Sequence, residues 1–550
     1  MTPDPPGAAE TAPQDSASAF VRNTTLMSVG TALSRLTGFL RLAAMAYAIG
    51  VTETRLTDAY NIANITPNII YELALGGILT SVFMPVFIEW LQTKGRDEAW
   101  DVARRMFTLA IVVLTSIAAL AIVFAPWIIR LYTLRLEQDR AATQALASFF
   151  LRWFMPQIVF YGIGAVAAGL LNAHRRFAAP MFAPILNNLL VIGTFVVFAQ
   201  LPGPVAGSGS LVTGAQKLVL AVGTTLGVIG MTVALWPAVR GVGFRFRWRA
   251  GFRHPAVVRI AHLAKWVVVY VVANQLGYLV IIVLAAPIKG GYSAYAAAFI
   301  VFQLPHAIFA VSIFTALLPA MSSRWTERDV AGFRALLSQG IRTTAAILLP
   351  AALGYMVLGR EIVRLLLEHG LAGPSSGELV ANILAFFAIG LFPFSLFQLL
   401  LRAFYSMQDT RTPALINILA VGLNTAVNFL YFFTFHLGVR GLALGHATAY
   451  TFASVAALVL LRRRLGGLDG KDVWPSVGRA FVAALATGGA AWIVARAMAH
   501  VVDPARFGGA AAQVLVAVAA GSLVFALAAR ILQMQEVDSV RRHLFARWRR

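Results

Sequence analysis

The chain has 550 residues, of which 59% are hydrophobic and 12% charged, and its mean hydropathy of +0.75 excludes a water-soluble protein. It carries 45 Lys and Arg against 23 Asp and Glu, a net charge of +22. On an apolar chain this excess is more typical of basic cytoplasmic loops than of a nucleic-acid partner. The chain has no Cys, which excludes disulfides, thiolate metal sites and a Cys nucleophile.

Long apolar runs dominate the chain after residue 21. Residues 1–21 are rich in Pro, Ala and acidic or hydroxyl residues and are predicted to form a disordered cytoplasmic tail. A bilayer core requires about 20 apolar residues per helix, and the first run is too long for a signal peptide. We predict an all-α polytopic membrane protein with about 14 transmembrane helices, at residues 24–50, 58–90, 104–132, 145–172, 178–201, 211–239, 256–286, 291–322, 334–359, 376–405, 411–437, 440–463, 474–500 and 508–533.

The distribution of basic residues predicts the orientation of these spans. Basic loops follow the second, fourth, sixth, eighth and twelfth runs, and the C-terminal tail is also basic. Short basic loops remain in the cytoplasm, so an even number of spans places both termini there. The segment 243–254, GFRFRWRAGFRH, alternates basic and aromatic residues. Such a segment could bind nucleic acid, because arginines contact phosphates and aromatic rings stack on bases. Between two spans it is better explained as an interfacial anchor that contacts anionic lipids.

An internal duplication divides the chain into two halves. Three prolines recur in order at nearly constant offsets: Pro67 and Pro305 (238 residues), Pro85 and Pro319 (234), and Pro180 and Pro413 (233). Halves of six spans each form a parallel repeat about an axis near the membrane normal, with a central cavity between them. The predicted units are an N-lobe (22–240, spans 1–6), a basic cytoplasmic linker (241–255), a C-lobe (256–465, spans 7–12), spans 13–14 (466–533) and a basic cytoplasmic tail (534–550).

Two arginines lie inside the first span. An ionisable group at mid-bilayer costs about 2.5 to 3.5 kcal/mol or more, so each one needs an explanation. Arg35 and Arg41 are six residues apart, which separates them by about 9 Å along a helix and by about 120° around it. They can line one broad wall of a cavity at two depths. Snorkelling is the alternative, but Arg35 stands about eleven residues into the span.

The second span carries two acidic residues and three candidate hinge positions. Asp58 opens the span and can cap the helix, take part in function, or do both. Glu72 lies deeper and is expected to pair with one of the arginines. Pro67, Gly76 and Gly77 are candidate hinges, as is Pro305 in the eighth span.

The second half adds one cation and a candidate ion site. Lys265, about ten residues into the seventh span, either faces the cavity or snorkels to the cytoplasmic surface. Asp409 stands at the start of the eleventh span, where an N-cap explains it best. Asp409 and Thr425 are also a possible cation site, since oxygen ligands such as those of Asn424, Thr425 and Asn428 suit Na⁺. Hydrogen bonds between helices are the better explanation of these mid-membrane groups.

Cations that face a membrane cavity with few carboxylates indicate an anionic substrate. Arginine forks match phosphate oxygens, so a phosphate or diphosphate is the natural expectation. A membrane phosphotransferase or glycosyltransferase would need clustered carboxylates for Mg²⁺, and the Asp and Glu residues of this chain are scattered. We therefore expect no enzyme, no catalytic residue, no metal site and no cofactor.

Several stretches together resemble the lipid II flippase (MurJ) family of the multidrug/oligosaccharidyl-lipid/polysaccharide exporter superfamily. The resemblance covers nearly the whole chain after the tail, and the matching stretches are SRLTGFLR from Ser34, TDAY from Thr57, PNIIYELALGGIL from Pro67, LNAHRRFAAPMFAPILNN from Leu171, QLPHAIFAVSIFTALLP from Gln303 and RAFYSMQDTRTP from Arg402. It departs from the family at Tyr71 and Glu72, where many members have an Arg pair. It also lacks an arginine that members carry shortly before the proline of the eighth span.

The resemblance implies a flippase that moves lipid II, the polyprenyl-diphosphate-linked peptidoglycan precursor, from the cytoplasmic to the outer leaflet of the bacterial plasma (inner) membrane. It implies that Arg35 and Arg41 bind the diphosphate, with Lys265 adding charge, and that Asp58 stabilises a gate. Spans 13 and 14 would form the groove for the polyprenyl tail. The expected partners are lipid II, membrane lipids and cell-wall synthesis proteins, with coupling to Na⁺ or the membrane potential. The alternatives are a polysaccharide-repeat flippase, a drug or cation antiporter of the same superfamily, and a non-transporting scaffold.

Overall fold

The computed structural model describes residues 30, 33–73, 84–174, 176–203, 212–249, 251, 253–534 and 536, and no strand occurs among them. Before the linker, the helices are residues 33–49, α2 (Arg55–Tyr71), α3 (Met84–Thr93), α4 (Arg96–Val123), α5 (Ala125–Tyr132), α6 (Arg140–Phe154), α7 (Gln157–Ala173), α8 (Ala178–Gln200), α9 (Gly214–Val233) and α10 (Trp236–Gly241). After it they are α11 (Pro255–Ala285), α12 (Gly291–Pro305), η3 (His306–Ala310), α13 (Val311–Thr326), α14 (Val330–Leu367), α15 (Pro374–Ile389), α16 (Leu391–Ser406), α17 (Arg411–Phe429), η4 (Leu430–Thr434), α18 (Val439–Arg464), α19 (Gly470–Ala499) and α20 (Phe507–Ile531).

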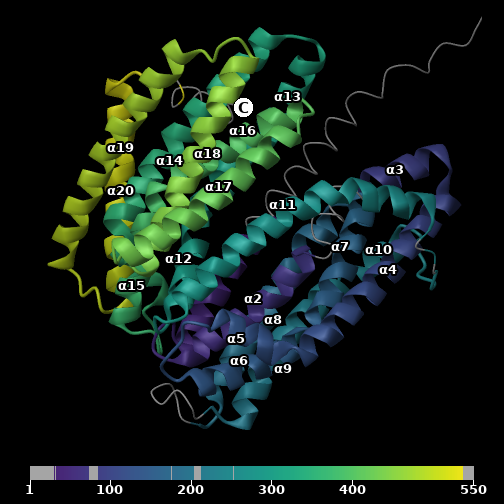
Figure 1. Ribbon diagram of the computed structural model, residues 1–550. Coiled ribbons are helices and arrows are strands. Elements are labelled where there is room, and N and C mark those ends of the chain that lie inside the picture. The colour runs from purple at the N-terminus through teal and green to yellow at the C-terminus, as the bar shows by residue number, and fades with distance from the viewer. Residues whose placement is uncertain are drawn as a thin grey trace, which may run out of the picture.

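The helices form two bundles, which we call the first and the second bundle. Figure 1 shows α2 to α10 in the first and α12 to α18 in the second, with α11 running along the boundary between them. The bundles meet where α2 contacts α12 and lie apart at the end that carries α3 and α13. Helices α19 and α20 pack on the outer side of the second bundle against α14. This arrangement agrees with the predicted two lobes and two additional helices.

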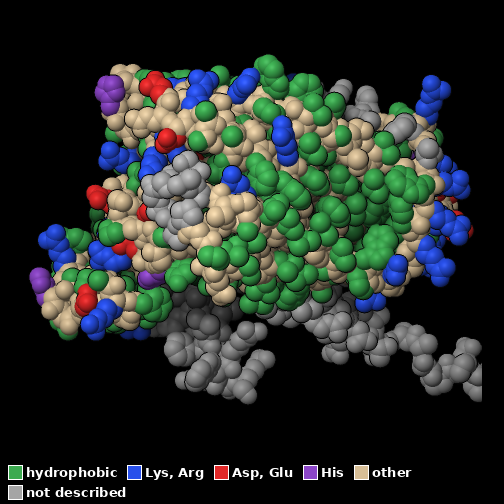
Figure 2. Space-filling view, turned by 90° about the horizontal axis from the view of Figure 1, so that it is seen from below, with side chains coloured by type: hydrophobic (Ala, Val, Ile, Leu, Met, Phe, Trp, Pro, Cys, Tyr) green, Lys and Arg blue, Asp and Glu red, His purple; other side chains and the backbone are tan. Residues whose placement is uncertain are grey.

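The surface of the molecule has the pattern of a membrane protein. Hydrophobic side chains cover the middle of the face drawn in Figure 2, and basic side chains gather toward its edges. Ten helices within the described residues are long and apolar enough to cross a membrane, or eleven when the bent pair α15 and α16 counts as one. The predicted count of fourteen is not confirmed. The remaining predicted spans, 24–50, 58–90 and 256–286, each include residues whose placement or side chains are not described.

The helical hydrogen bonding changes next to two of the predicted hinge prolines. Pro67 lies in α2, which ends in a π turn at residues 72–73, and Pro305 ends α12, where the π helix η3 begins. Proline has no N–H to donate, so each proline leaves the carbonyl four residues before it without its helical partner. The two prolines occupy equivalent places in the repeat, and each is followed by a π-helical segment. Gly76 and Gly77 lie outside the described residues.

The linker is held against the first bundle. Phe244 is buried and stacks on Phe107 of α4, with ring centroids 5.1 Å apart. Arg104 Nε donates to the carbonyl of Arg245 at 3.2 Å, and the Arg249 N–H donates to Thr108 Oγ1 at 3.2 Å. Phe244 and Phe246 therefore pack on the bundle, whereas Trp248 and the arginines stay exposed, as an interfacial anchor requires.

Candidate functional site

The structure brings Arg41 to a cavity between the two bundles. The first bundle lines this cavity with Arg41, Tyr60 and Asn64, and the second with Ser293 and Ile300 of α12. Arg41 is half-buried and lies close enough to the Tyr60 hydroxyl to interact with it electrostatically. The cavity therefore combines one cation with hydroxyl and amide groups, which suits an anion that carries hydrogen-bond acceptors.

Arg35 also faces the second bundle, nearer to the end where the bundles lie apart. Its side chain is exposed and interacts electrostatically with His306 of η3. His306 is held in place by Ser395 of α16, whose Oγ lies 2.8 Å from His306 Nδ1. Arg35 and Arg41 thus lie on the inter-bundle side of the first helix at two depths.

Neither arginine is neutralised by the part of the chain that the structure describes. The ion pairs between described residues include neither Arg35 nor Arg41. Glu72, which was predicted to pair with one of them, stands exposed on the π turn after α2 and makes none of these ion pairs. Lys265 lies in α11, and its side chain is outside the described part. The described residues also hold no cluster of His, Asp or Glu suited to a metal ion.

Asp58 closes the opposite end of the boundary, where the bundles meet. Its carboxylate is buried and accepts hydrogen bonds from the N–H of Gly290 at 2.7 Å, the N–H of Ser293 at 3.3 Å and Ser293 Oγ at 2.8 Å. The N-cap position of α2 is Thr54, which makes no capping bond with its side chain. Asp58 therefore joins the two bundles, and the capping role that the sequence left open is not observed.

Arg55 extends the same contact. Its Nη1 lies 3.6 Å from Asp58 Oδ2, and its guanidinium donates to the carbonyls of Ala286 at 3.1 Å and Pro287 at 3.2 Å. Both members of the ion pair are buried. Removing one partner of a buried pair leaves an uncompensated charge, so this contact depends on both residues. We call the contacts of Asp58 and Arg55 with residues 286–293 the gate.

A second contact lies beside the gate, in the loop between the first helix and α2. The Glu53 carboxylate accepts from the N–H groups of Val51 at 2.7 Å and Gly373 at 2.8 Å and from Ser376 Oγ. Thr52 Oγ1 lies 2.5 Å from Ser376 Oγ. Burial raises the pKa of the Glu53 carboxyl, but the hydrogen bonds from Ser376, Gly373 and Val51 outweigh burial and hold that pKa below its usual value. We call the contact of residues 52–53 with residues 373–376 the latch.

The latch gives a pH-dependent prediction. Because the folded-state pKa of Glu53 is lowered, its contribution to stability is complete above the unfolded pKa of about 4.3 and is lost as the pH falls through the folded-state pKa. We expect Glu53→Gln to lower the free energy of unfolding by about 1 to 3 kcal/mol at pH 7 and by much less near pH 3. Thermal unfolding in detergent at both pH values measures the difference. Glu137→Gln, at an exposed loop position, is the control, and an equal loss at both pH values would contradict the assignment.

Gly290 allows the gate to close. Its φ is +70°, and a Cβ at this position would lie 2.3 Å from Thr52 Cα. Gly95 has a φ of +88° with nothing within 4 Å of a Cβ, so it provides a matched control. Both Gly→Ala changes cost about 1 to 2 kcal/mol in backbone strain, and only Gly290→Ala adds a clash across the boundary. We expect a larger fall in the unfolding temperature for Gly290→Ala, and equal falls would show that the close approach is unimportant.

The repeat explains why these residues meet. The gate joins Arg55 to Pro287 and Asp58 to Gly290, each 232 residues apart, close to the offsets of the repeated prolines. Equivalent helices of two parallel repeats face each other across their common axis, so the starts of α2 and α12 come together. Asp58 was predicted from sequence, whereas Arg55 and Glu53 were not. The offset itself is the signal that could have found Arg55.

The predicted cation site is not assembled. Asp409 stands two residues before α17, and Thr425 lies in its second half, sixteen residues or about 24 Å of helical rise away. The Asp409 carboxylate instead accepts from the Thr412 N–H at 3.0 Å and from Thr412 Oγ1 at 2.7 Å, and it pairs with Arg464. Asp409 therefore stabilises the start of α17, the role that an N-terminal cap predicts.

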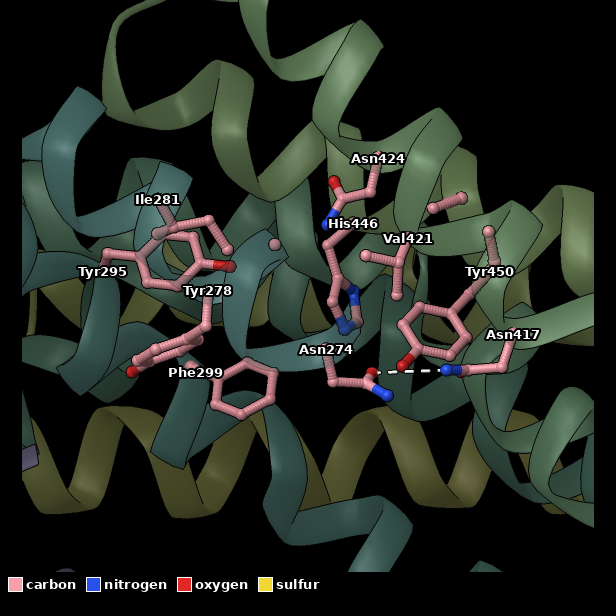
Figure 3. A pocket seen from close by; sticks show the side chains of 13 residues that line it. Asn274, Tyr278, Ile281, Tyr295, Phe299, Asn417, Val421, Asn424, His446 and Tyr450 are labelled. Carbon is pink, nitrogen blue, oxygen red and sulfur yellow. Dashed lines mark hydrogen bonds between the residues drawn. The ribbon is translucent and has the colours of Figure 1, made fainter. Parts of the chain in front are cut away.

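A separate cavity with an apolar and aromatic lining and a few polar groups lies between α11, α12, α17 and α18. Figure 3 shows Asn274, Asn424 and His446 around it, and Asn417 Nδ2 donates to Asn274 Oδ1 at 3.3 Å. The buried Oδ1 atoms of Asn424 and Asn428 have no hydrogen-bond partner in the described part of the chain. No Asp, Glu, Lys or Arg lines this cavity, so it is neutral.

Comparisons with known proteins agree with this architecture. The sequence profile of the family described as "Lipid II flippase MurJ" matches residues 45–505. The chain is 28% identical over 443 residues to a probable lipid II flippase MurJ of Rhizobium meliloti, covering 80% of each protein. It is 29% identical over 443 residues to a lipid II flippase MurJ of Burkholderia cenocepacia, covering 79% of this chain and 82% of that protein.

Solved structures show the same fold. A lipid II flippase MurJ in an inward closed conformation superposes with a TM-score of 0.75 at 19% identity, covering 93% of this chain and all of the other. An inward-facing multidrug resistance MATE transporter of the MOP superfamily superposes with a TM-score of 0.65 at 15% identity, covering 80% of this chain and 99% of the other. At these identities the likeness concerns the fold alone.

Proposed function

Because the chain belongs to the lipid II flippase MurJ family, we propose that it moves lipid II from the cytoplasmic to the outer leaflet of the bacterial plasma membrane. The observation that carries the proposal is the family match over residues 45–505, together with unpaired arginines on the inter-bundle side of the first helix. Transport of this kind makes and breaks no covalent bond. The chain therefore acts as a transporter rather than as an enzyme.

The arginines bind the head group through its diphosphate. Charge-assisted, paired hydrogen bonds from arginine forks are among the strongest that proteins make to phosphate. Arg41 contributes from the cavity between the bundles and Arg35 from the wider end of the boundary. Two unpaired cations at this depth are costly, and the negative diphosphate offsets that cost when it binds. Lys265 adds a further cation from α11.

Alternating access follows from the contacts between the bundles. They are joined at the gate and the latch and lie apart at the opposite end. The distribution of basic loops places the gate on the outer side and both termini in the cytoplasm. Substrate then enters from the cytoplasm, and the gate opens as the bundles rock, with bends at Pro67 and Pro305 absorbing part of the change.

The remaining helices and partners complete the proposal. Helices α19 and α20 border α14 and supply an apolar surface for the polyprenyl tail.

Coupling to Na⁺ or to the membrane potential drives the cycle, and the unpaired amide oxygens of Asn424 and Asn428 offer acceptors for a monovalent cation. Flipping rates that stay unchanged after removal of Na⁺ and of the potential would contradict the coupling. Cell-wall synthesis proteins are the expected protein partners.

Complementation tests the function in cells. The wild-type chain, expressed in a strain depleted of its own lipid II flippase, is expected to restore growth and to prevent accumulation of lipid II. Failure to do so, with the chain correctly inserted in the membrane, would contradict the proposal. Rescue of a strain that lacks a polysaccharide-repeat flippase instead would favour that alternative of the same superfamily.

A further inference from the structure

Arg402 is a third arginine that acts at the boundary between the bundles. It lies in the last turns of α16, seven residues after Ser395, so the two residues share one face of the helix. Ser395 on that face holds His306 of η3, and Arg402 interacts electrostatically with His306, as Arg35 of the first bundle does. His306 therefore has an arginine from each bundle in its neighbourhood.

Arg402 has no acidic partner in the described part of the chain. Its side chain is exposed, and none of the ion pairs between described residues includes it. By contrast, Arg360 and Arg364 of α14 both pair with Glu368. Arg35 and Arg402 both act on His306 and like charges repel, so an anion bound between the two arginines would be favourable.

We propose that Arg402 binds the diphosphate of the lipid-linked substrate together with Arg35, so that the anion bridges the two bundles. The proposal rests on the proposed function and adds a residue of the second bundle to its site. An anion held by one arginine from each bundle draws the bundles together at the end where they lie apart. Closing that end favours opening of the gate, so substrate binding itself biases the change of access.

Binding of polyprenyl ligands to the purified full-length chain tests this assignment. The probes are a polyprenyl diphosphate, the corresponding monophosphate and the uncharged polyprenol, each titrated against wild type, Arg402→Ala, Arg402→Gln, Arg402→Lys and Arg463→Ala. Arg463 is an exposed arginine near the end of α18 and serves as the matched control. Unfolding temperatures identify the variants that remain folded. If Arg402→Ala does not fold, Arg402→Gln takes its place in the comparison.

We expect Arg402→Ala to weaken diphosphate binding about 10-fold or more, because a charged hydrogen bond is lost. Binding of the polyprenol should not change, Arg402→Lys should retain part of the affinity, and Arg463→Ala should bind like wild type. Wild-type affinity for the diphosphate in both neutral variants would overturn the assignment, as would an equal loss for the polyprenol. If the wild-type chain neither prefers the diphosphate nor complements a flippase-depleted strain, the proposed function itself fails.

Discussion

Arg41→Ala and Arg35→Ala are each expected to reduce lipid II flipping about 10-fold or more and to fail in complementation. Each removes a charged hydrogen bond to the diphosphate, a loss of about 1.5 to 3 kcal/mol. Arg41→Ala should have the larger effect, because the Arg41 side chain is half-buried and lines the cavity, whereas the Arg35 side chain is exposed. The measurement is growth of a flippase-depleted strain together with its lipid II content. Lysine at either position is expected to restore part of the activity, since it keeps the charge but loses the fork.

Arg463→Ala is the control for both changes, because it removes an exposed arginine from the last turn of α18. Protein levels in the membrane must match those of the wild type. If Arg35→Ala and Arg41→Ala both support normal peptidoglycan synthesis, the substrate site is wrong.

Locking the latch with a disulfide is expected to abolish transport. The side chains of Thr52 and Ser376 already meet, with Oγ1 and Oγ 2.5 Å apart, and the natural chain has no Cys to compete. Thr52→Cys with Ser376→Cys should therefore cross-link under oxidation and hold the bundles together at the gate. Flipping should fall to background in the oxidised protein and return when a reductant is added.

The single-cysteine variants control for loss of the latch hydrogen bonds. Each should transport at a similar rate with or without oxidant, because neither can form the cross-link. An oxidised double variant that still flips lipid II at the rate of the reduced protein would show that the gate does not need to open.

The fold was largely predictable because hydropathy and proline spacing are properties of the sequence itself. Runs of about 20 apolar residues mark the spans, and the offset between Pro67 and Pro305 marks the repeat. The two bundles and the additional α19 and α20 follow from these signals. The described residues contain ten or eleven helices that could cross a membrane, fewer than the fourteen predicted.

The site was predictable only where a charge is costly in the membrane. Arg35 and Arg41 were recognised in this way, and the structure places both at the boundary between the bundles. Glu53 was missed because its partners Gly373 and Ser376 lie about 320 residues away, beyond the reach of local patterns. Arg402 was missed because it lies one turn from the end of its helix. At that position a basic residue resembles the cytoplasmic charges that orient membrane spans.

Two predicted roles depended on three-dimensional features that the sequence does not show directly, namely where a side chain points and how far apart two residues lie. Asp58 had the position of a helix cap, yet its carboxylate points to Gly290 and Ser293 of the other bundle. Asp409 stands just before α17 and Thr425 lies near its other end, so sixteen residues separate them.

Translocation of lipid II by the purified chain in liposomes tests the central proposal most directly. Lipid II labelled in its head group is placed in the inner leaflet, and its arrival in the outer leaflet is followed with a reagent that cannot cross the membrane. We predict transfer that depends on the protein, falls about 10-fold or more with Arg41→Ala and stops when the oxidised Thr52→Cys, Ser376→Cys pair locks the latch. Transfer no faster than in protein-free liposomes, from wild-type chain shown to be folded, would contradict the account.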